Sequence, residues 1–528
     1  MLLEGRSRSR TIRGRVAMTV VLVTTVSVLF AGNAAAALRT AKTHPTAKPA
    51  LTIGVSSFSA TIGDPAKTVQ GQGTTLFSLA YAPLIHLTAN GALQPALATS
   101  WRYVHGPAGP NTGFELTLRH DAHFADGTLV TAQSVRAWLL HFSKTSVNAS
   151  FMPLKSVNTI GKWRVRFNLK APVSEVPLFL ADASQQNWGF VASPKVLRGA
   201  SSLTTTSDGA GPYVLSPSQS VIGDHYTFVP NKYFYNPSAI RFSKVVVRIL
   251  ASPSSMLQAL QSGQLDVAYG DTTTAGAAAR AGFTVTKAPV LQAGLLFLDR
   301  SGTMSKPLSD VRVRQALNYA VDRRAIAKAL VGRFGAPTSE YRTADGWDPK
   351  YQNYYSYSPA KARSLLAAAG YSGGFTLAVD SNGPWGALGD QLTQAVAQYY
   401  KAVGVNVDDT DASASQFASG LFGKQFPAIE NPLSIVPMGL GANYFGATAG
   451  GVNVFGLSDP TLGRIYLAGQ RSTKPGKYWE EMSRRFTQQA VGVPVFLSDG
   501  IWYSRKSVGG VAFGPYSTYP LASGFTPK

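Results

Sequence analysis

A pair of histidines near two aspartates is the first place in this sequence where side chains could carry out chemistry. His120 and His123 are separated by two residues and stand beside Asp121 and Asp126. Imidazole and carboxylate groups are ligands that zinc prefers in proteins. The same four residues also surround the end of a strand-like segment and its turn, in a chain that has only 7 histidines. We therefore interpret them as turn residues and predict no metal site.

A second candidate is Ser358-Pro-Ala-Lys361, which matches the S-x-x-K motif of acyl-transferring serine enzymes. Its S-D-N and K-T-G companions do not occur, and Ser358 before a proline is typical of a helix N-cap. Glu480 and Glu481 are adjacent in the sequence. On a helix their side chains would point about 100° apart, which is poor geometry for a paired acid and base. The H-E-x-x-H and P-loop motifs are also missing from the sequence. We predict a non-enzyme without catalytic residues or cofactors.

The charge of the chain suggests a different chemistry, the binding of acidic molecules. The sequence of 528 residues has 49 Lys and Arg against 27 Asp and Glu, a net charge of +22. The segment DVRVRQALNYAVDRRAI, residues 310–326, is rich in arginine. Elsewhere the basic residues are scattered, without the runs of five or six that are typical of tails that bind polyanions. We expect no nucleic acid partner; a basic surface protein that binds polyanions or wall polymers is the alternative.

The arginine-rich segment has the pattern of two short helices. The first presents one apolar stripe to a core, made of Val313, Ala316, Leu317 and Ala320. The polar residues off this stripe are Arg312, Arg314, Gln315 and Asn318. Asp322 is well placed to cap a second helix, with Arg323 and Arg324 in its first turn. Because arginine there opposes the helix dipole, we expect these two side chains to have acidic or backbone partners.

The N-terminus has the organisation of an export signal. Residues 1–15 carry five Arg and one Glu, an apolar run follows at Val16–Ala31, and the small-residue segment GNAAAALRT comes next. This order predicts a signal peptide of residues 1–37, cleaved after Ala36 or Ala37. An uncleaved membrane anchor is the alternative, although sixteen apolar residues are fewer than the roughly 20 that span a bilayer. Cleavage would lower the net charge to +18, because five Arg and one Glu are removed.

The absence of cysteine limits what the exported protein can be. With 0 Cys, it has no disulfide, no thiolate chemistry and no N-terminal cysteine for a lipid anchor. Residues 38–50, rich in Pro, Ala, Lys and Thr, read as a flexible tether. We expect location in the periplasm or at the outer face of the cell membrane.

Strand-like and helix-like segments alternate through the rest of the chain. Alternation with period 2 predicts strands at 114–120 and 163–170, and the segment between them predicts a helix capped by Thr131. Further strands are expected at 241–250, 265–270, 374–380 and 405–409, and helices at 252–262, 358–369 and 386–403. This alternation predicts α/β lobes with mostly parallel sheets.

Several segments together resemble the family 5 extracellular solute-binding proteins, the dipeptide, oligopeptide and nickel-type receptors of ABC importers. The first match is GALQPALATSWRY followed by FELTLRHDAHFADGTLVTAQSVRAWL, in which Phe124, Asp126, Gly127 and Thr131 fit the family signature. DGAGPYVL, NKYFYN and MLQALQSGQLDVAYG are similar to further family segments, as are DVRVRQALNYAVDRRAIAKAL and YSPAKARSLLAAAGY. The matches keep the family's order from about residue 51 to about residue 510.

The resemblance implies a type II periplasmic-binding-protein fold, in which two α/β lobes joined by two chain crossings enclose a ligand cleft. Lobe one would comprise residues 51–289, with an extra subdomain at about 75–205. Lobe two would comprise residues 290–490, and residues 491–528 would return to lobe one.

The resemblance also implies which residues line the ligand site. Trp385 and Asn382 lie in a loop between a strand and a helix, where α/β proteins tend to bind ligands; the alternative is that Trp385 packs within its own lobe. A later loop supplies Glu430, Asn431 and Tyr444. The tryptophan and aspartate that family peptide binders often have there are missing, which puts recognition of a ligand α-amino group in doubt.

From lobe one we add Tyr81 and Trp188 as ligand-binding candidates, with the core of the lobe as the alternative position. The function that follows from the resemblance is a monomeric, extracytoplasmic receptor. It would capture a small solute, in the first instance a peptide, and deliver it to a membrane ABC permease. A secreted hydrolase with an unrecognised site is a further alternative.

Overall fold

The computed structural model describes residues 47–528 except for 57–63, 68–72, 147, 183–185, 200–201, 204, 342, 344, 382–386, 411, 431–432 and 443–452. The predicted signal peptide therefore lies outside the described residues. No helix in the described part of the chain is both long enough and apolar enough to span a membrane.

One large mixed sheet runs through the protein, in the order β15-β14-β16-β12-β18-β11-β1-β10-β9-β8. Its first group of strands is β8 (Tyr213–Leu215), β9 (His225–Pro230), β10 (Lys244–Ile249), β1 (Ala50–Val55) and β11 (Val267–Gly270). Its second group is β16 (Ala428–Glu430), β14 (Phe375–Asp380) and β15 (Val405–Asp409). Pairing is parallel around β1 and β14 but antiparallel at most other positions, so the expectation of mostly parallel sheets was wrong.

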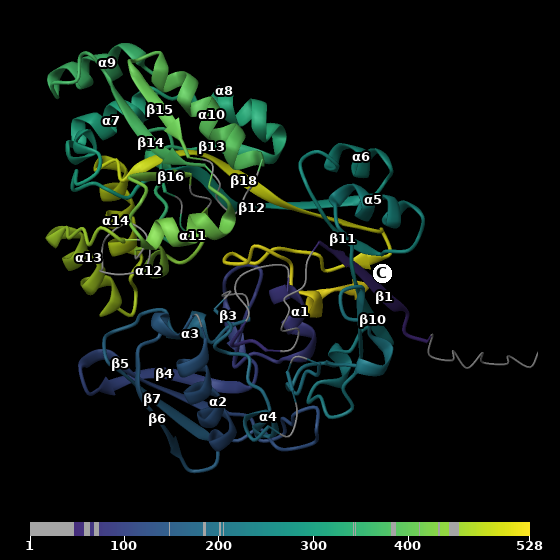
Figure 1. Ribbon diagram of the computed structural model, residues 1–528. Helices are drawn as coiled ribbons and strands as arrows, with labels where there is room; N and C mark the ends of the chain where they lie inside the picture. Colours follow the sequence, from purple (N-terminus) through teal and green to yellow (C-terminus); the bar gives the residue numbers. More distant parts are fainter. Residues whose placement is uncertain are drawn as a thin grey trace, which may run out of the picture. The chain divides into compact units, whose positions relative to one another are not determined.

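Two long strands connect these groups. β12 (Thr284–Phe297) pairs antiparallel with β18 (Gly492–Ser504), from Thr284 opposite Ser504 to Leu296 opposite Gly492 (Figure 1). β11 pairs with the end of β18, residues 501–504, whereas β16 pairs with the end of β12, residues 295–297. A register shift at Pro289 and Leu291 separates the two parts of β12. Each of the two chain crossings is therefore one continuous strand.

Separate hydrophobic cores surround the two strand groups. One set of buried side chains comes from residues 51–285 and the C-terminal segment, and another from residues 293–496. We call the parts built on these cores lobe one and lobe two; the predicted limits of the domains stay a prediction. Phe334, Val436 and Leu440 are exceptions, because they belong to lobe two in sequence but pack into the cores of lobe one.

Helices cover both lobes. The helices of lobe one are α1 (Gly73–Ala80), α2 (Ala132–Thr145), α3 (Val176–Phe179), α4 (Pro194–Leu197), α5 (Pro253–Gln261) and α6 (Ala275–Arg280). Those of lobe two are α7 (Val311–Tyr319), α8 (Arg323–Leu330), α9 (Pro359–Ala368), α10 (Ala387–Lys401), α11 (Ala414–Phe422), α12 (Met438–Gly441), α13 (Pro460–Gln470) and α14 (Gly476–Gln488). Three predicted N-caps are confirmed: the Thr131 side chain accepts from Ser134 N, the Asp322 side chain from Ala325 N, and the Ser358 side chain from Lys361 N.

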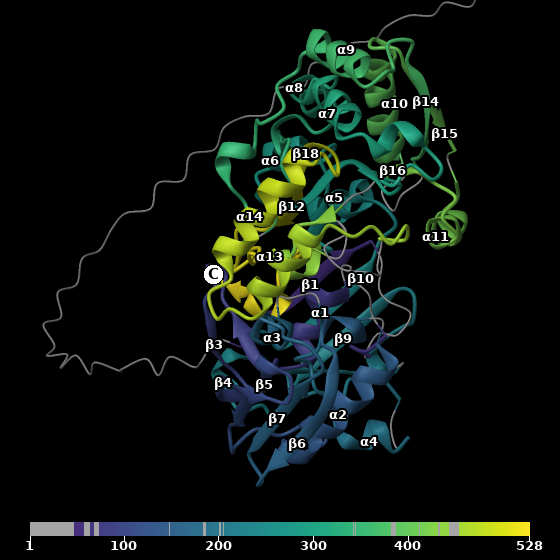
Figure 2. The ribbon, with the colours of Figure 1, turned by 90° about the vertical axis from the view of Figure 1, so that its left-hand side faces the viewer.

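A four-stranded antiparallel sheet forms a separate layer of lobe one. Its order is β4 (Ala98–Gly106), β5 (Gly109–Leu118), β7 (Arg164–Leu169) and β6 (Leu154–Ile160). Helix α2 contacts β6 and β7, and it lies against this sheet in Figures 1 and 2. A hairpin precedes this sheet in the chain and consists of β2 (Ile85–Leu87) and β3 (Leu93–Pro95).

The family-like signature residues are structural. Phe124 is fully buried, and Asp126 accepts hydrogen bonds from Thr128 N at 2.8 Å and Ser193 Oγ at 2.7 Å. Burial opposes ionisation of Asp126, but these bonds lower its pKa. Gly127 has φ +83°, a backbone conformation that favours glycine. The signature thus fixes a turn that leads into α2.

The two histidines of the candidate metal cluster are also structural. The His120 ring stacks on Trp163 at 4.4 Å, and His123 Nδ1 lies 3.1 Å from the carbonyl oxygen of Asp121. Among the described residues, no group of three or more His, Asp or Glu side chains could hold a metal ion.

Two arginines of the arginine-rich segment connect parts of lobe two. Arg314 in α7 donates to the carbonyl oxygens of Leu308 at 2.7 Å and Gln489 at 2.9 Å. Arg323 in α8 donates to Pro494 O at 2.7 Å and Asn318 Oδ1 at 2.7 Å, which confirms the expected backbone partners. Arg314 and Asn318 lie off the apolar stripe but are buried, because a second face of α7 packs against residues 488–494. Burial lowers the pKa of both guanidinium groups to about 10, so they remain charged at neutral pH.

Candidate functional site

Three acidic side chains meet where parallel strands of lobe two end. Asp380 ends β14, Glu430 ends β16, and Asp390 lies in the first turn of α10. Because β14 and β16 are parallel, their carboxyl ends lie at the same edge of the sheet, where α/β proteins tend to bind ligands. Helix α10 lies close to Glu430, since a Cβ atom added at Gly389 would lie 3.0 Å from Glu430 Oε2.

Glu430 is the predicted ligand-binding residue that the structure describes best. Its side chain is fully buried, and neither carboxylate oxygen has a hydrogen-bond partner among the described residues. Burial raises its pKa to about 8, and the charges of Asp390 and Asp380 add to the rise. At neutral pH Glu430 is therefore mostly protonated, and a bound cation would favour its ionised form.

The neighbouring acids differ from Glu430 because the protein itself supplies them with donors. Asp380 Oδ1 accepts from Ala412 N at 2.9 Å, and Asp409 Oδ1 accepts from Ser381 N at 3.2 Å. Ser381 Oγ lies 3.4 Å from Asp390 Oδ1. These bonds fix the strand-end loops around Glu430.

The other predicted site residues fall into two groups. Trp385, Asn382, Asn431 and Tyr444 lie outside the described residues. Tyr81 and Trp188 are fully buried in the core of lobe one, the alternative position considered for both. Trp188 Nε1 donates to Asn148 O at 3.2 Å, and Tyr81 lies 6.2 Å from Phe190, ring centre to ring centre. A ligand-binding role for these six predicted residues stays a prediction.

Polar contacts connect the two lobes along what we call the seam: Asn111, Ser174 and Glu175 of lobe one, with α12 and residues 470–472 of lobe two. Asn111 Nδ2 donates to Gln470 O at 2.9 Å and Ser472 O at 3.0 Å. Gln470 Oε1 in turn accepts from Ser174 N at 2.7 Å. Asn111 has φ 56°, which an asparagine adopts more readily than most residues.

A second pair of carboxylates approaches α12 at the seam. A Cβ at Gly439 would collide with the Glu175 carboxylate, so this acid lies directly on the helix backbone. The preceding residue, Met438, donates its N–H to Asp345 Oδ1 at 2.7 Å. Burial raises the pKa of Glu175 to about 8, with a further contribution from the Asp345 charge, and burial raises the pKa of Asp345 to about 6.

The sequence offered no signal for the seam. Asn111 and Gln470 are 359 residues apart, and the separation of Glu175 from α12 is similarly large. Each residue type is common in turns and helix termini, so no local pattern distinguishes them. Only the pairing of the lobes brings them together.

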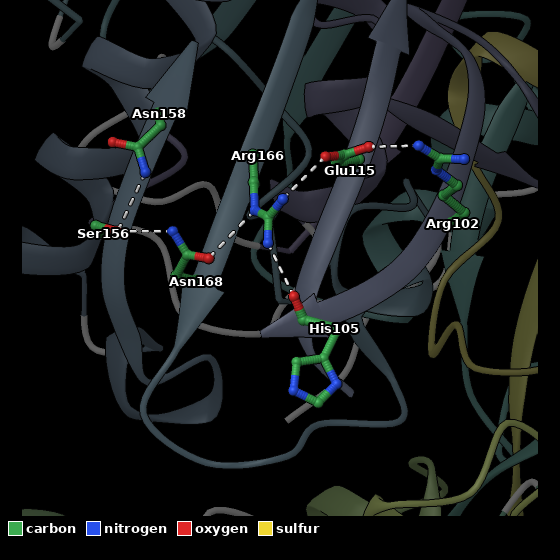
Figure 3. Close-up of polar contacts among 7 residues, drawn as sticks. All are labelled: Arg102, His105, Glu115, Ser156, Asn158, Arg166 and Asn168. Carbon is green, nitrogen blue, oxygen red and sulfur yellow. Dashed lines mark hydrogen bonds and ion pairs between the residues drawn. The ribbon is translucent and has the colours of Figure 1, made fainter. Parts of the chain in front are cut away.

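One face of the four-stranded sheet carries a network of polar side chains around Glu115 (Figure 3). Glu115 Oε2 pairs with Arg102 Nη2 at 3.0 Å, and Glu115 Oε1 pairs with Arg166 Nη1 at 3.3 Å. The network continues from Arg166 through Asn168 to Ser156. The glutamate offsets part of the arginine charge at this face.

Comparison with known proteins identifies the family. Residues 92–447 match the family described as Bacterial extracellular solute-binding proteins, family 5 Middle. The chain belongs to this family. Family 5 membership confirms the resemblance on which the predicted fold depends.

One curated relative is the nickel-binding periplasmic protein of Escherichia coli strain K12. It is 26% identical to this chain over 315 residues, which are 56% of each chain. The glutathione-binding protein GsiB of Escherichia coli O1:K1 is 25% identical over 327 residues, 59% of this chain and 60% of its own. The chain thus spans a little over half the length of the curated relatives it matches.

Solved structures confirm the type II periplasmic-binding-protein fold. The murein tripeptide-binding protein MppA of Escherichia coli has a TM-score of 0.70 at 19% identity, covering 91% of this chain and 98% of its own. NikA from Brucella suis in complex with Fe(III)-EDTA has a TM-score of 0.74 at 20% identity, covering 91% and 100%.

Proposed function

We propose that this protein is a non-enzymatic extracytoplasmic receptor that binds a solute between its lobes and delivers it to a membrane ABC importer. The solute we propose is a peptide. The observation that carries the proposal is the architecture of family 5: two α/β lobes, each with its own core, joined by the two long strands β12 and β18. Two crossings of this kind allow a hinge motion that a transporter can recognise.

The strand-end acids support a ligand with hydrogen-bond donors. Glu430 is buried without a partner among the described residues, at the edge of the sheet where ligands are expected. A peptide ammonium or amide group would supply the missing donor. Relatives named for peptide and glutathione binding also favour a peptide as the solute.

The proposal includes the predicted organisation of the chain. Residues 1–37 are removed as a signal peptide, 38–50 form a tether, and the lobes comprise 51–289 and 290–490 with a return at 491–528. The mature protein is a monomer in the periplasm or at the outer face of the membrane, without a cysteine-linked lipid.

Native mass spectrometry of the purified mature protein tests the proposal. We expect a co-purified solute with the mass of a short peptide, released when the protein is denatured. Small-angle scattering with a pool of tripeptides to hexapeptides should show a decrease in the radius of gyration, because ligand closes the lobes.

Two results would contradict the proposal. Turnover of a peptide or ester by clean protein would identify an enzyme. Binding that needs a polyanion and weakens steeply with salt, with no small solute bound, would favour the surface-protein alternative.

A further inference from the structure

Glu175 is a buried acid for which the described part of the protein supplies no donor. It precedes α3, its side chain is 2% exposed, and neither oxygen has a hydrogen-bond partner among the described residues. No Lys or Arg in that part of the chain forms an ion pair with Glu175 or with Asp345. Burying an ionised carboxylate without a partner is strongly unfavourable, so the group needs either a proton or a positive charge.

The surroundings of Glu175 include a second acid, and Ser174 and Gln470 offset only part of the rise in the pKa of Glu175. Asp345 reaches the same turn of α12, at Met438, that Glu175 contacts at Gly439. Gln470 presents its side-chain oxygen to Ser174, the residue before Glu175. Burial and the charge of Glu175 raise the pKa of the Tyr466 phenol to about 12, so this ring is also close. The pKa of Tyr516 is raised by burial, Asp345 and Glu175.

Asp299 shows how this protein treats a buried acid that has only a structural role. Asp299 is fully buried, and its oxygens accept from Ser301 Oγ and from the backbone N–H groups of residues 302–305, at 2.6–3.0 Å. Burial alone would raise its pKa, but these bonds lower it. Glu175 has no such set of donors among the residues that the structure describes, although the chain has 49 basic residues that could have supplied one.

We propose that Glu175 and Asp345 form a subsite for a positively charged organic group of the bound solute, a primary ammonium or a guanidinium. The proposal rests on the proposed function, since it assumes a solute between the lobes. Such a group carries several N–H donors and one positive charge, which suit the Glu175 carboxylate, unpaired among the described residues, and the nearby Asp345 carboxylate, which accepts from Met438 N. Because Glu175 belongs to lobe one and Asp345 to lobe two, a cation shared by both would also stabilise the closed arrangement of the lobes.

Calorimetry with matched tripeptides tests the subsite. The probes are Ala-Lys-Ala, Ala-Arg-Ala and Ala-Lys-Ala acetylated at Nζ (the acetylated peptide), all three with an acetylated N-terminus so that only the side chain can carry a positive charge. They are titrated into the mature protein at pH 8, and into the variants Glu175→Gln and Glu480→Gln. Glu480 is exposed on α14 and serves as the control. Wild type and Glu480→Gln should bind the charged peptides at least tenfold more tightly than the acetylated one. Glu175→Gln should lose this preference and keep its affinity for the acetylated peptide.

The outcomes separate the subsite from the proposed function. Equal binding of charged and acetylated peptides by wild type would overturn the subsite and leave the peptide receptor intact. A preference that survives in Glu175→Gln would also overturn it. A third result would also overturn the subsite: wild type alone binds the acetylated peptide more tightly at pH 6 than at pH 8 and shows no preference for the charged peptides. This result would show that a proton, not a ligand cation, neutralises Glu175. Failure of all three peptides to bind would count against both proposals.

Discussion

At the scale of single residues, two of the arginines that suggested a surface for acidic molecules, Arg314 and Arg323, are buried and bind backbone oxygens of lobe two. Arg323 is 6% exposed and donates to oxygens of Pro494, Asn318 and Tyr355. A guanidinium group suits this position because its five N–H donors can satisfy several carbonyl oxygens at once. Arg324, the next residue, is exposed. Two adjacent arginines therefore have different roles that their sequence does not distinguish.

This difference predicts unequal losses of stability. Arg323→Ala should lower the free energy of unfolding by about 3 kcal/mol or more, because it leaves several buried carbonyl oxygens without donors. Arg324→Ala should change it by less than about 0.5 kcal/mol. Urea unfolding followed by circular dichroism measures both. Similar losses in the two variants would contradict the role given to Arg323.

Glu430 predicts a dependence of stability on pH. Its pKa is about 8 in the folded protein and 4.5 when unfolded, so the folded state holds the proton more tightly. The contribution is complete below about pH 4.5 and is lost as the pH rises through 8. The melting temperature without ligand should therefore fall between pH 5 and pH 8, and less so in Glu430→Gln. Glu480→Gln should follow wild type; an unchanged slope in Glu430→Gln would contradict the assignment.

At the scale of elements, glycines decide where strands of lobe two can approach each other. Gly374, just before β14, has φ +75°, and a Cβ there would collide with the carbonyl oxygen of Gly404 before β15. Gly373 has no atom within 4 Å of such a Cβ. The parallel β14–β15 pair therefore starts with a backbone contact that only glycine permits.

Alanine substitutions separate these two glycines. Gly374→Ala should destabilise the protein by about 2–4 kcal/mol, since it adds an unfavourable φ to a collision with backbone atoms. Gly373→Ala should be nearly neutral. Thermal unfolding of both variants checks this, and a tolerated Gly374→Ala would show that the strands can separate at low cost.

At the scale of the whole molecule, the seam connects parts that are far apart in the chain. Asn111 gives two hydrogen bonds to lobe two, each worth about 0.5–1.5 kcal/mol. They form only while β5 and the end of α13 are in contact. The seam should therefore contribute to the equilibrium between open and closed lobes.

Asn111→Gly tests this contribution, since glycine keeps the positive φ but removes the side-chain donor. We expect affinity for the peptide pool to fall about tenfold and the radius of gyration to increase in small-angle scattering. Lys424→Gly is the control, because Lys424 also has a positive φ, 58°, but is exposed. Equal behaviour of the two variants would contradict a role for the seam in closure.

The sequence by itself determined the local elements and the family. Some signals act over only a few residues, so they can be recognised without the rest of the chain. They are helix caps such as Thr131 and Ser358, the period of the apolar residues, and turn glycines. The family-like motifs, which follow one another in the family's order, predicted the two-lobe fold. They too can be recognised locally, because each motif fixes a turn or the start of a helix.

Only the tertiary structure decided which polar groups are buried and which of them meet. Burial of Arg314 depends on residues 488–494, and burial of Glu175 depends on α12, more than 250 residues away. Most strand pairs proved antiparallel because β12 and β18 cross between the lobes side by side. Desolvation and pairing of charges arise from such distant contacts, and no local pattern in the sequence encodes them.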